Sequence, residues 1–182
     1  MIPAGYMAKR VSARPEWLAA GTVVDVCSVS RCVSKDFADY IPYWRHNGYW
    51  FFDSLEIIRQ LARDHSLDLT GTSAFFYEVH ELQFDARATR WAPFDPEPSF
   101  PTQVVLPLET ALEGYDVVTF SVGTSAECSP LSCNSLASEV ETNRHCLLAS
   151  LELARQLLEA GRFDATEPGP YRIFAVYSVR WP

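Results

Sequence analysis

The sequence predicts an α+β fold in which two helices pack on a mainly antiparallel sheet. Two segments, SLEIIRQL (54–61) and SLELARQL (150–157), have the apolar spacing of amphipathic helices. Each lies between two runs rich in β-branched and aromatic residues, which indicate strands. The resulting order, β-α-β followed by β-α-β, is that of a ferredoxin-like arrangement, here with long loop insertions. Residues 1–182 are expected to form a single domain, since a chain of this length can bury one large core.

The two helix segments begin with the same chemistry. Ser54 and Ser150 can each accept a hydrogen bond from a backbone N–H group that has no partner within the first turn. Glu56 and Glu152 add negative charge near the positive end of the helix dipole. We therefore expect an internal duplication that relates residues 22–85 to residues 115–180. Leu, Glu, Arg and Gln are common in any helix, so a chance resemblance is the alternative.

The strands are expected in four places. Residues 1–21 should lead into the domain without a strand, and residues 22–30 should form the first strand. The other strands are expected at 75–85, 115–123 and 171–179. Long connections at 31–50 and 86–113 separate these elements. Within the second connection, the acidic segment 91–108 has five prolines, which exclude a helix or a central strand, so it is expected to be a loop between the halves.

Charge is distributed unevenly along the chain. Residues 91–143 contain no Lys or Arg, and the eight acidic residues of this stretch equal the net charge of −8. Residues 36–53 are the most aromatic part of the sequence. Together these features favour a non-enzymatic protein that holds a basic protein partner, as an inhibitor, an immunity-type protein or an accessory protein would. The residues expected at this surface are Tyr43, Trp44, Tyr49, Trp50, Asp95, Glu97, Glu109, Glu113 and Asp116.

Two plainer interpretations of the same residues stay open. An acidic face can simply keep a protein in solution, and the aromatic segment can fold onto the core or form a homodimer contact. Nucleic acid is not an expected partner, because binding it would require positive charge.

The cysteines offer an alternative to a pure binding role. Four of the five form two pairs with the same separation, and a duplicated chain could bring them together around zinc: Cys27 with Cys32, and Cys128 with Cys133. Packed free thiols explain the same residues, and the first expectation is that no cofactor is bound. A small cysteine-dependent enzyme is the other form of this alternative, with Cys128 or Cys133 acting beside His145. Glu127 opposes that chemistry, because an adjacent carboxylate raises the pKa of the Cys128 thiol.

Common catalytic and cofactor motifs are absent from the sequence, among them the P-loop, the dinucleotide fingerprint, HExxH and GxSxG. No apolar run is long enough to span a bilayer, and the first residues lack the apolar core of a signal peptide. A cytoplasmic protein without a membrane partner is therefore expected, with its cysteines reduced.

Overall fold

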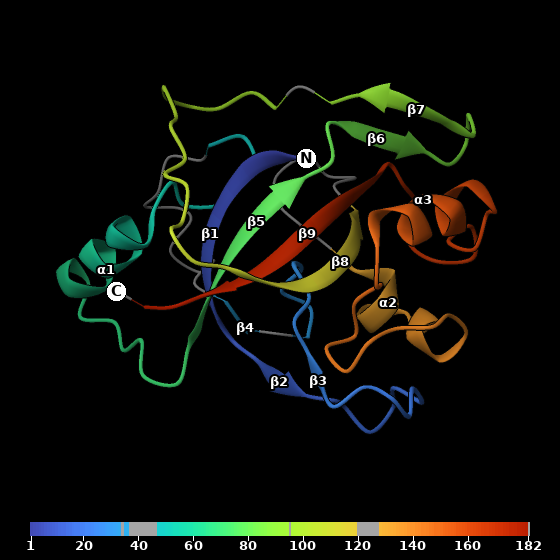
Figure 1. Ribbon diagram of the computed structural model, residues 1–182, viewed down its shortest axis with the longest axis horizontal. Coiled ribbons are helices and arrows are strands. Elements are labelled where there is room, and N and C mark those ends of the chain that lie inside the picture. Colours follow the sequence, from blue (N-terminus) through green and yellow to red (C-terminus); the bar gives the residue numbers. More distant parts are fainter. Residues whose placement is uncertain (34, 37–46, 95, 120–127, 182) are drawn as a thin grey trace.

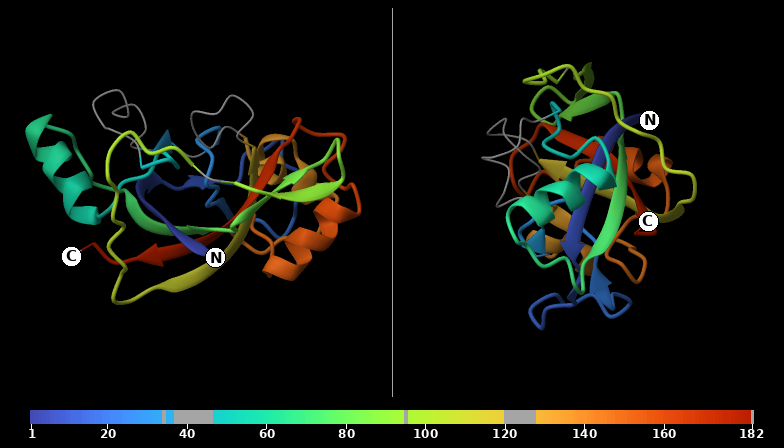
Figure 2. Two further views of the ribbon diagram at one scale, coloured as in Figure 1. Left: turned by 90° about the horizontal axis from the view of Figure 1, so that it is seen from above. Right: turned by 90° about the vertical axis from the view of Figure 1, so that its left-hand side faces the viewer.

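A computed structural model describes residues 1–33, 35–36, 47–94, 96–119 and 128–181 of the chain. Its main feature is a curved sheet, with one helix near each end of the long axis of the molecule (Figure 1; Figure 2). The described strands of this sheet are β1 (Ile2–Arg10), β4 (Lys35–Asp36), β5 (Ser73–Val79), β6 (Leu82–Asp85), β7 (Arg90–Pro93), β8 (Ala111–Thr119) and β9 (Tyr171–Val179). The prediction of an α+β fold with a mainly antiparallel sheet is confirmed.

Strand β9 lies at the centre of the sheet, as its apolar sequence predicts. It pairs with β5 and β6 along one edge and with β8 along the other, and β5 pairs with β1. β4 lies beside β1, and β7 lies beside β6. All of these pairs are antiparallel. A separate ribbon of β2 (Ser12–Ala13) and β3 (Asp25–Val26) completes the described strands.

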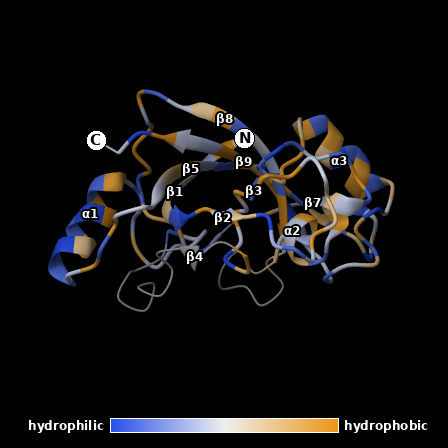
Figure 3. Cartoon of the chain, turned by 90° about the horizontal axis from the view of Figure 1, so that it is seen from below, coloured by the Kyte–Doolittle hydropathy of each residue, from blue (hydrophilic) through white to orange (hydrophobic). Residues whose placement is uncertain are grey.

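The two predicted helices are α1 (Leu55–Asp64) and α3 (Leu151–Glu159). Each begins at its predicted serine cap: Ser54 Oγ accepts a hydrogen bond at 3.3 Å from the first turn of α1, and Ser150 Oγ accepts one at 3.1 Å in α3. Both helices carry hydrophilic and hydrophobic residues on different sides (Figure 3), so each can bury one face and leave the other in solvent. A short helix α2 (Pro130–Cys133) and a 3₁₀ helix (Leu136–Ser138) precede α3.

The same local structure precedes both helices. In the first copy, the side chain of Asn47 accepts hydrogen bonds from the N–H groups two and four residues further on, and donates one to the carbonyl of Ala4 in β1. In the second copy, Asn143 accepts from the N–H groups two and four residues further on, and donates to the carbonyl of Glu113 in β8. The chain therefore contains one asparagine-centred turn twice, with one copy tied to β1 and the other to β8.

A glycine follows each of these carbonyls, and the close approach of the backbone explains both. Gly5 and Gly114 have φ of 127° and 146°, and a Cβ atom at either position would lie 2.7 or 2.8 Å from a backbone carbonyl oxygen. β1 and β8 thus occupy equivalent positions relative to the two turns, while the duplication of residues 22–85 and 115–180 stays a prediction. The strands β1 and β5 are antiparallel neighbours, and so are β8 and β9, whereas a β-α-β unit joins parallel strands. The ferredoxin-like part of the prediction is therefore not confirmed.

Some segments differ from the predicted strands. Residues 1–21, expected to form no strand, contain β1, whose alternation is hidden because residues 4–9 are all buried. Residues 22–30 contain only the two residues of β3, because residues 28–30 bond to the buried side chains of Lys9 and Asp116 instead of to a neighbouring strand. The strand expected at 75–85 is interrupted into β5 and β6, and the connection at 86–113 contains β7 and the start of β8.

Within the described part of the chain, every helix is too short and too polar to cross a lipid bilayer.

Candidate functional site

Two buried charged side chains organise the loop that follows β3. Lys9 projects from β1, and its ammonium group donates hydrogen bonds to three consecutive carbonyl oxygens, those of Ser28, Val29 and Ser30, at 2.6, 3.0 and 2.7 Å. Lys9 is fully buried, so these bonds replace the hydration that its charge loses. The backbone of residues 28–30 is thereby fixed above the sheet.

Asp116, in β8, holds the same loop and a second one. Its Oδ2 atom accepts from the hydroxyl of Ser28 and the N–H of Val29 at 2.9 and 2.8 Å, and its Oδ1 atom accepts from the hydroxyl of Ser129 at 2.5 Å. Asp116 is completely buried, and burial raises the pKa of its carboxyl group to about 6, although the three hydrogen bonds oppose the shift. One carboxylate thus joins the loop before Cys32 to the loop after Cys128.

Three thiols meet where these two loops come together. The Sγ atoms of Cys32, Cys128 and Cys133 all lie within 4.8 Å of one another, and Ser30 Oγ lies 3.7 Å from Cys133 Sγ. Cys32 is exposed, Cys128 is buried and Cys133 is partly buried. Hydrogen bonds from the other two thiols hold the pKa of Cys32 well below its ordinary value, whereas the pKa of Cys128 is raised by its hydrogen bonds within the same group and by burial. We call Cys32, Cys128 and Cys133 the thiol triad.

The spacing of the thiol triad suits a metal ion. With zinc–sulfur bonds of about 2.3 Å, neighbouring thiolates of a tetrahedral site lie about 3.8 Å apart, which is inside the observed limit. Three thiolates fill three of the four tetrahedral positions, and the exposure of Cys32 gives an ion a route from solvent. Three of the four predicted zinc ligands are therefore brought together. The fourth, Cys27, belongs to another group.

Cys27 lies beside Asp25 and His145. Its Sγ atom is 3.6 Å from Asp25 Oδ1 and 3.7 Å from His145 Nδ1, and the latter two atoms are 2.6 Å apart. The structure thus places His145 against Cys27, and not against Cys128 or Cys133 as the predicted enzyme requires. Burial and the charge of Asp25 raise the pKa of the Cys27 thiol, which makes Cys27 a poor nucleophile.

The residues predicted to bind a basic partner are scattered. Asp116 and Tyr49 are buried, so their side chains do not reach a surface, contrary to the prediction. Glu113 is partly buried beside Ser178 and His145, and Trp50 is also partly buried. Glu97 and Glu109 are exposed as expected, whereas Tyr43, Trp44 and Asp95 lie outside the described residues. In the described part of the aromatic segment, Phe51 and Phe52 pack in the core, which agrees with the plainer interpretation of that segment.

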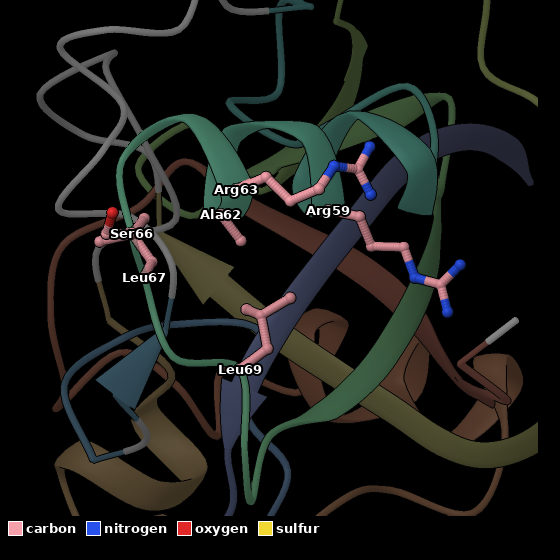
Figure 4. A pocket seen from close by; sticks show the side chains of 6 residues that line it. All are labelled: Arg59, Ala62, Arg63, Ser66, Leu67 and Leu69. Atoms are coloured by element: carbon pink, nitrogen blue, oxygen red, sulfur yellow. The ribbon is translucent and has the colours of Figure 1, made fainter.

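Two surface hollows in the described part of the chain are lined by residues outside both cysteine groups. One, of about 420 Å³, lies at the end of α1 and is lined by Arg59, Ala62, Arg63, Ser66, Leu67 and Leu69 (Figure 4). Both arginine side chains extend away from Ser66 and Leu67 (Figure 4), and Arg63 donates hydrogen bonds to Glu56 and Gln60 of its own helix. A second hollow, of about 440 Å³, lies between the start of α1 and residues 105–109. The first offers no convergent set of chemical groups.

No protein-family model, curated protein or solved structure matches this chain, so its function must be inferred from its own residues. Sequence reasoning missed Lys9, Asp25 and the buried role of Asp116. A signal was present for Asp116, because it stands inside the apolar run YDVVTF, where an acidic side chain must find buried partners.

Proposed function

We propose that the protein binds a thiophilic metal ion, zinc being the best match, through the thiol triad, and that it uses this ion in a metal-dependent reaction. The observation that carries the proposal is the meeting of three thiols from two loops that lie about a hundred residues apart in the chain. Lys9 and Asp116, both buried, hold those loops through six hydrogen bonds. Such preorganisation lowers the cost of assembling a metal site.

The ligand number supports a catalytic ion over a purely structural one. Structural zinc sites use four protein ligands, whereas catalytic sites use three and leave the fourth position to water or substrate. Among the residues that the structure describes, the thiol triad supplies three. A metal ion with an open position lowers the pKa of bound water and polarises a carbonyl or phosphoryl oxygen, which is the chemistry expected here.

Replacing Cys133 with serine should weaken metal binding at the thiol triad at least 100-fold, since a hydroxyl is a poor ligand for a thiophilic ion. The measurement is titration of the reduced protein with Co²⁺, followed by the near-ultraviolet charge-transfer band of cobalt–thiolate bonds. Cys146→Ser is the matched control, because Cys146 is a buried free cysteine that belongs to neither cysteine group. Equal losses in both variants, or no thiolate band in the wild-type protein, would contradict the proposal.

A second candidate function, the binding of a basic partner, is favoured by one surface. Large apolar side chains are exposed along residues 105–112, namely Val105, Leu106, Leu108 and Leu112. They flank Glu109, whose side chain is 77% exposed, and several of them line the 440 Å³ hollow. We call these five residues the apolar-acidic patch. An exposed apolar group with acidic neighbours fits a partner that presents lysine or arginine beside leucine.

Binding to the apolar-acidic patch should weaken about tenfold between low and physiological salt, and by a similar factor on Glu109→Lys. The probe is a synthetic peptide of alternating lysine and leucine, measured by calorimetry. Glu139→Lys is the control, since Glu139 is also exposed and lies 3.7 Å from an arginine, as Glu109 lies 3.8 Å from one. Binding that ignores salt, or that both substitutions weaken equally, would count against this function.

A further inference from the structure

We propose that Asp25, Cys27 and His145 form a second metal-binding site, distinct from the thiol triad and not dependent on it. Their ligand atoms are a carboxylate oxygen, a thiol sulfur and an imidazole nitrogen, and all lie within 4.8 Å of one another. Zinc and cobalt accept this mixed set of ligands.

The backbone fixes the two segments that carry these ligands. The N–H groups of Val24 and Asp25 donate to the carbonyl of Arg144 at 2.8 and 3.2 Å, and the N–H of Cys27 donates to the carbonyl of His145 at 3.1 Å. The N–H of His145 in turn donates to the side chain of Asn143 at 2.9 Å. The three ligands therefore stand on a rigid frame, which is what a preformed metal site requires.

The imidazole ring of His145 has a partner on each side. Its Nε2 atom lies 3.4 Å from Oε2 of Glu113, while its Nδ1 atom lies 2.6 Å from Oδ1 of Asp25. Glu113 is itself held, because Ser178 donates a hydrogen bond to its Oε1 atom at 2.5 Å. A carboxylate near Nε2 favours a proton on that nitrogen, which leaves the lone pair of Nδ1 directed at the opposite side of the ring, as in carboxylate–histidine–zinc groups.

Nδ1 of His145 and the Asp25 carboxylate oxygen lie 2.6 Å apart, which is the distance of a hydrogen bond with one shared proton. A metal ion bound to both atoms would displace that proton and the proton of Cys27. Cys27 Sγ lies almost equally far from the two atoms, at 3.6 and 3.7 Å, so the thiol faces the point where the ion would sit. The side chains of Asp25, His145 and Glu113 are each 23% exposed, which leaves an ion access from solvent.

The repeated turn shows that the fold does not need these groups. Tyr49 occupies the position of His145 in the first copy, two residues after Asn47, and Ala4 occupies the position of Glu113. The first copy forms the same hydrogen bonds although Tyr49 has no imidazole and Ala4 has no carboxylate. His145 and Glu113 are thus an addition to a turn whose hydrogen bonds also form without them.

Metal stoichiometry tests the second site separately from the thiol triad. The wild-type protein should bind two equivalents of Co²⁺, the double variant Cys32→Ser/Cys133→Ser should bind one, and His145→Gln should bind one. In the double variant, a further His145→Gln change should weaken the remaining binding at least 100-fold, whereas His65→Gln, at an exposed histidine after α1, should leave it within twofold.

Each alternative outcome identifies the site that fails. One equivalent in the wild-type protein and none in the double variant would overturn the second site and leave the thiol triad standing. One equivalent in the double variant and none in His145→Gln would support the second site and overturn the function proposed for the thiol triad. Asp25→Asn repeats the test if His145→Gln fails to fold. The imidazole ¹⁵N shifts of His145 in the double variant must also change on adding Zn²⁺, since unchanged shifts would show that a proton alone occupies the position.

Discussion

Replacing Lys9 with methionine is expected to lower the free energy of unfolding by about 3–5 kcal/mol. The side chain of methionine keeps most of the volume and the apolar stem of lysine but has no N–H group to donate. The carbonyl oxygens of Ser28, Val29 and Ser30 would each lose a donor at 2.6–3.0 Å in a region closed to water. A buried polar group without its partner costs about 1–3 kcal/mol. Here three carbonyl groups depend on the single ammonium group of Lys9.

Chemical denaturation of the reduced protein measures this effect. Arg10→Met is the control, because Arg10 is the next residue in β1 and is exposed, so its loss should change stability by less than about 0.5 kcal/mol. Lys9→Met should also weaken Co²⁺ binding at the thiol triad, since the loop leading to Cys32 loses one of its two attachments and keeps only that to Asp116. A Lys9→Met protein as stable as Arg10→Met would show that the three carbonyls find other donors.

The features that the sequence predicts correctly are local ones. A helix cap needs only a serine and the N–H group three residues later, so Ser54 and Ser150 could be assigned without knowledge of the fold. The same holds for β9, whose nine residues are mostly apolar and β-branched or aromatic. The α+β class follows from these elements because their order and type restrict how the layers can pack.

The features that the sequence predicts incorrectly depend on contacts between distant segments. The thiol triad joins residues 32 and 128–133, and equal spacing within the two cysteine pairs could not show that Cys27 lies in a different group. Asp116 was assigned to the surface because most acidic residues are solvated, yet its three hydrogen-bond donors come from two separate loops. β1 was missed because Gly5 and the small residues around it do not have the composition of a typical strand.

The buried Asp116 should make stability depend on pH in a direction opposite to that of most carboxylates. Burial raises its pKa to about 6 in the folded protein, from 3.8 in the unfolded chain. Between these two values the folded state binds more protons than the unfolded state, so the contribution of Asp116 to the free energy of unfolding falls as the pH rises. Two pKa units correspond to about 3 kcal/mol, nearly all of it lost by pH 7.

Asp116→Asn isolates this contribution, because other titrating groups are common to both proteins and cancel in the difference. The asparagine replaces one acceptor oxygen with a donor, which then faces either the N–H of Val29 or the hydroxyl of Ser129 and adds a cost that does not change with pH. Relative to this variant, the wild-type protein should lose about 2 kcal/mol between pH 4 and pH 7, measured by urea denaturation at half-unit intervals. Parallel profiles for the two proteins would mean that Asp116 is not desolvated. If instead the difference in free energy of unfolding between the two proteins falls with pH, the protein keeps an ionised carboxylate in its interior at neutral pH. This costs stability, and we expect that cost because the same carboxylate holds the two cysteine loops in place.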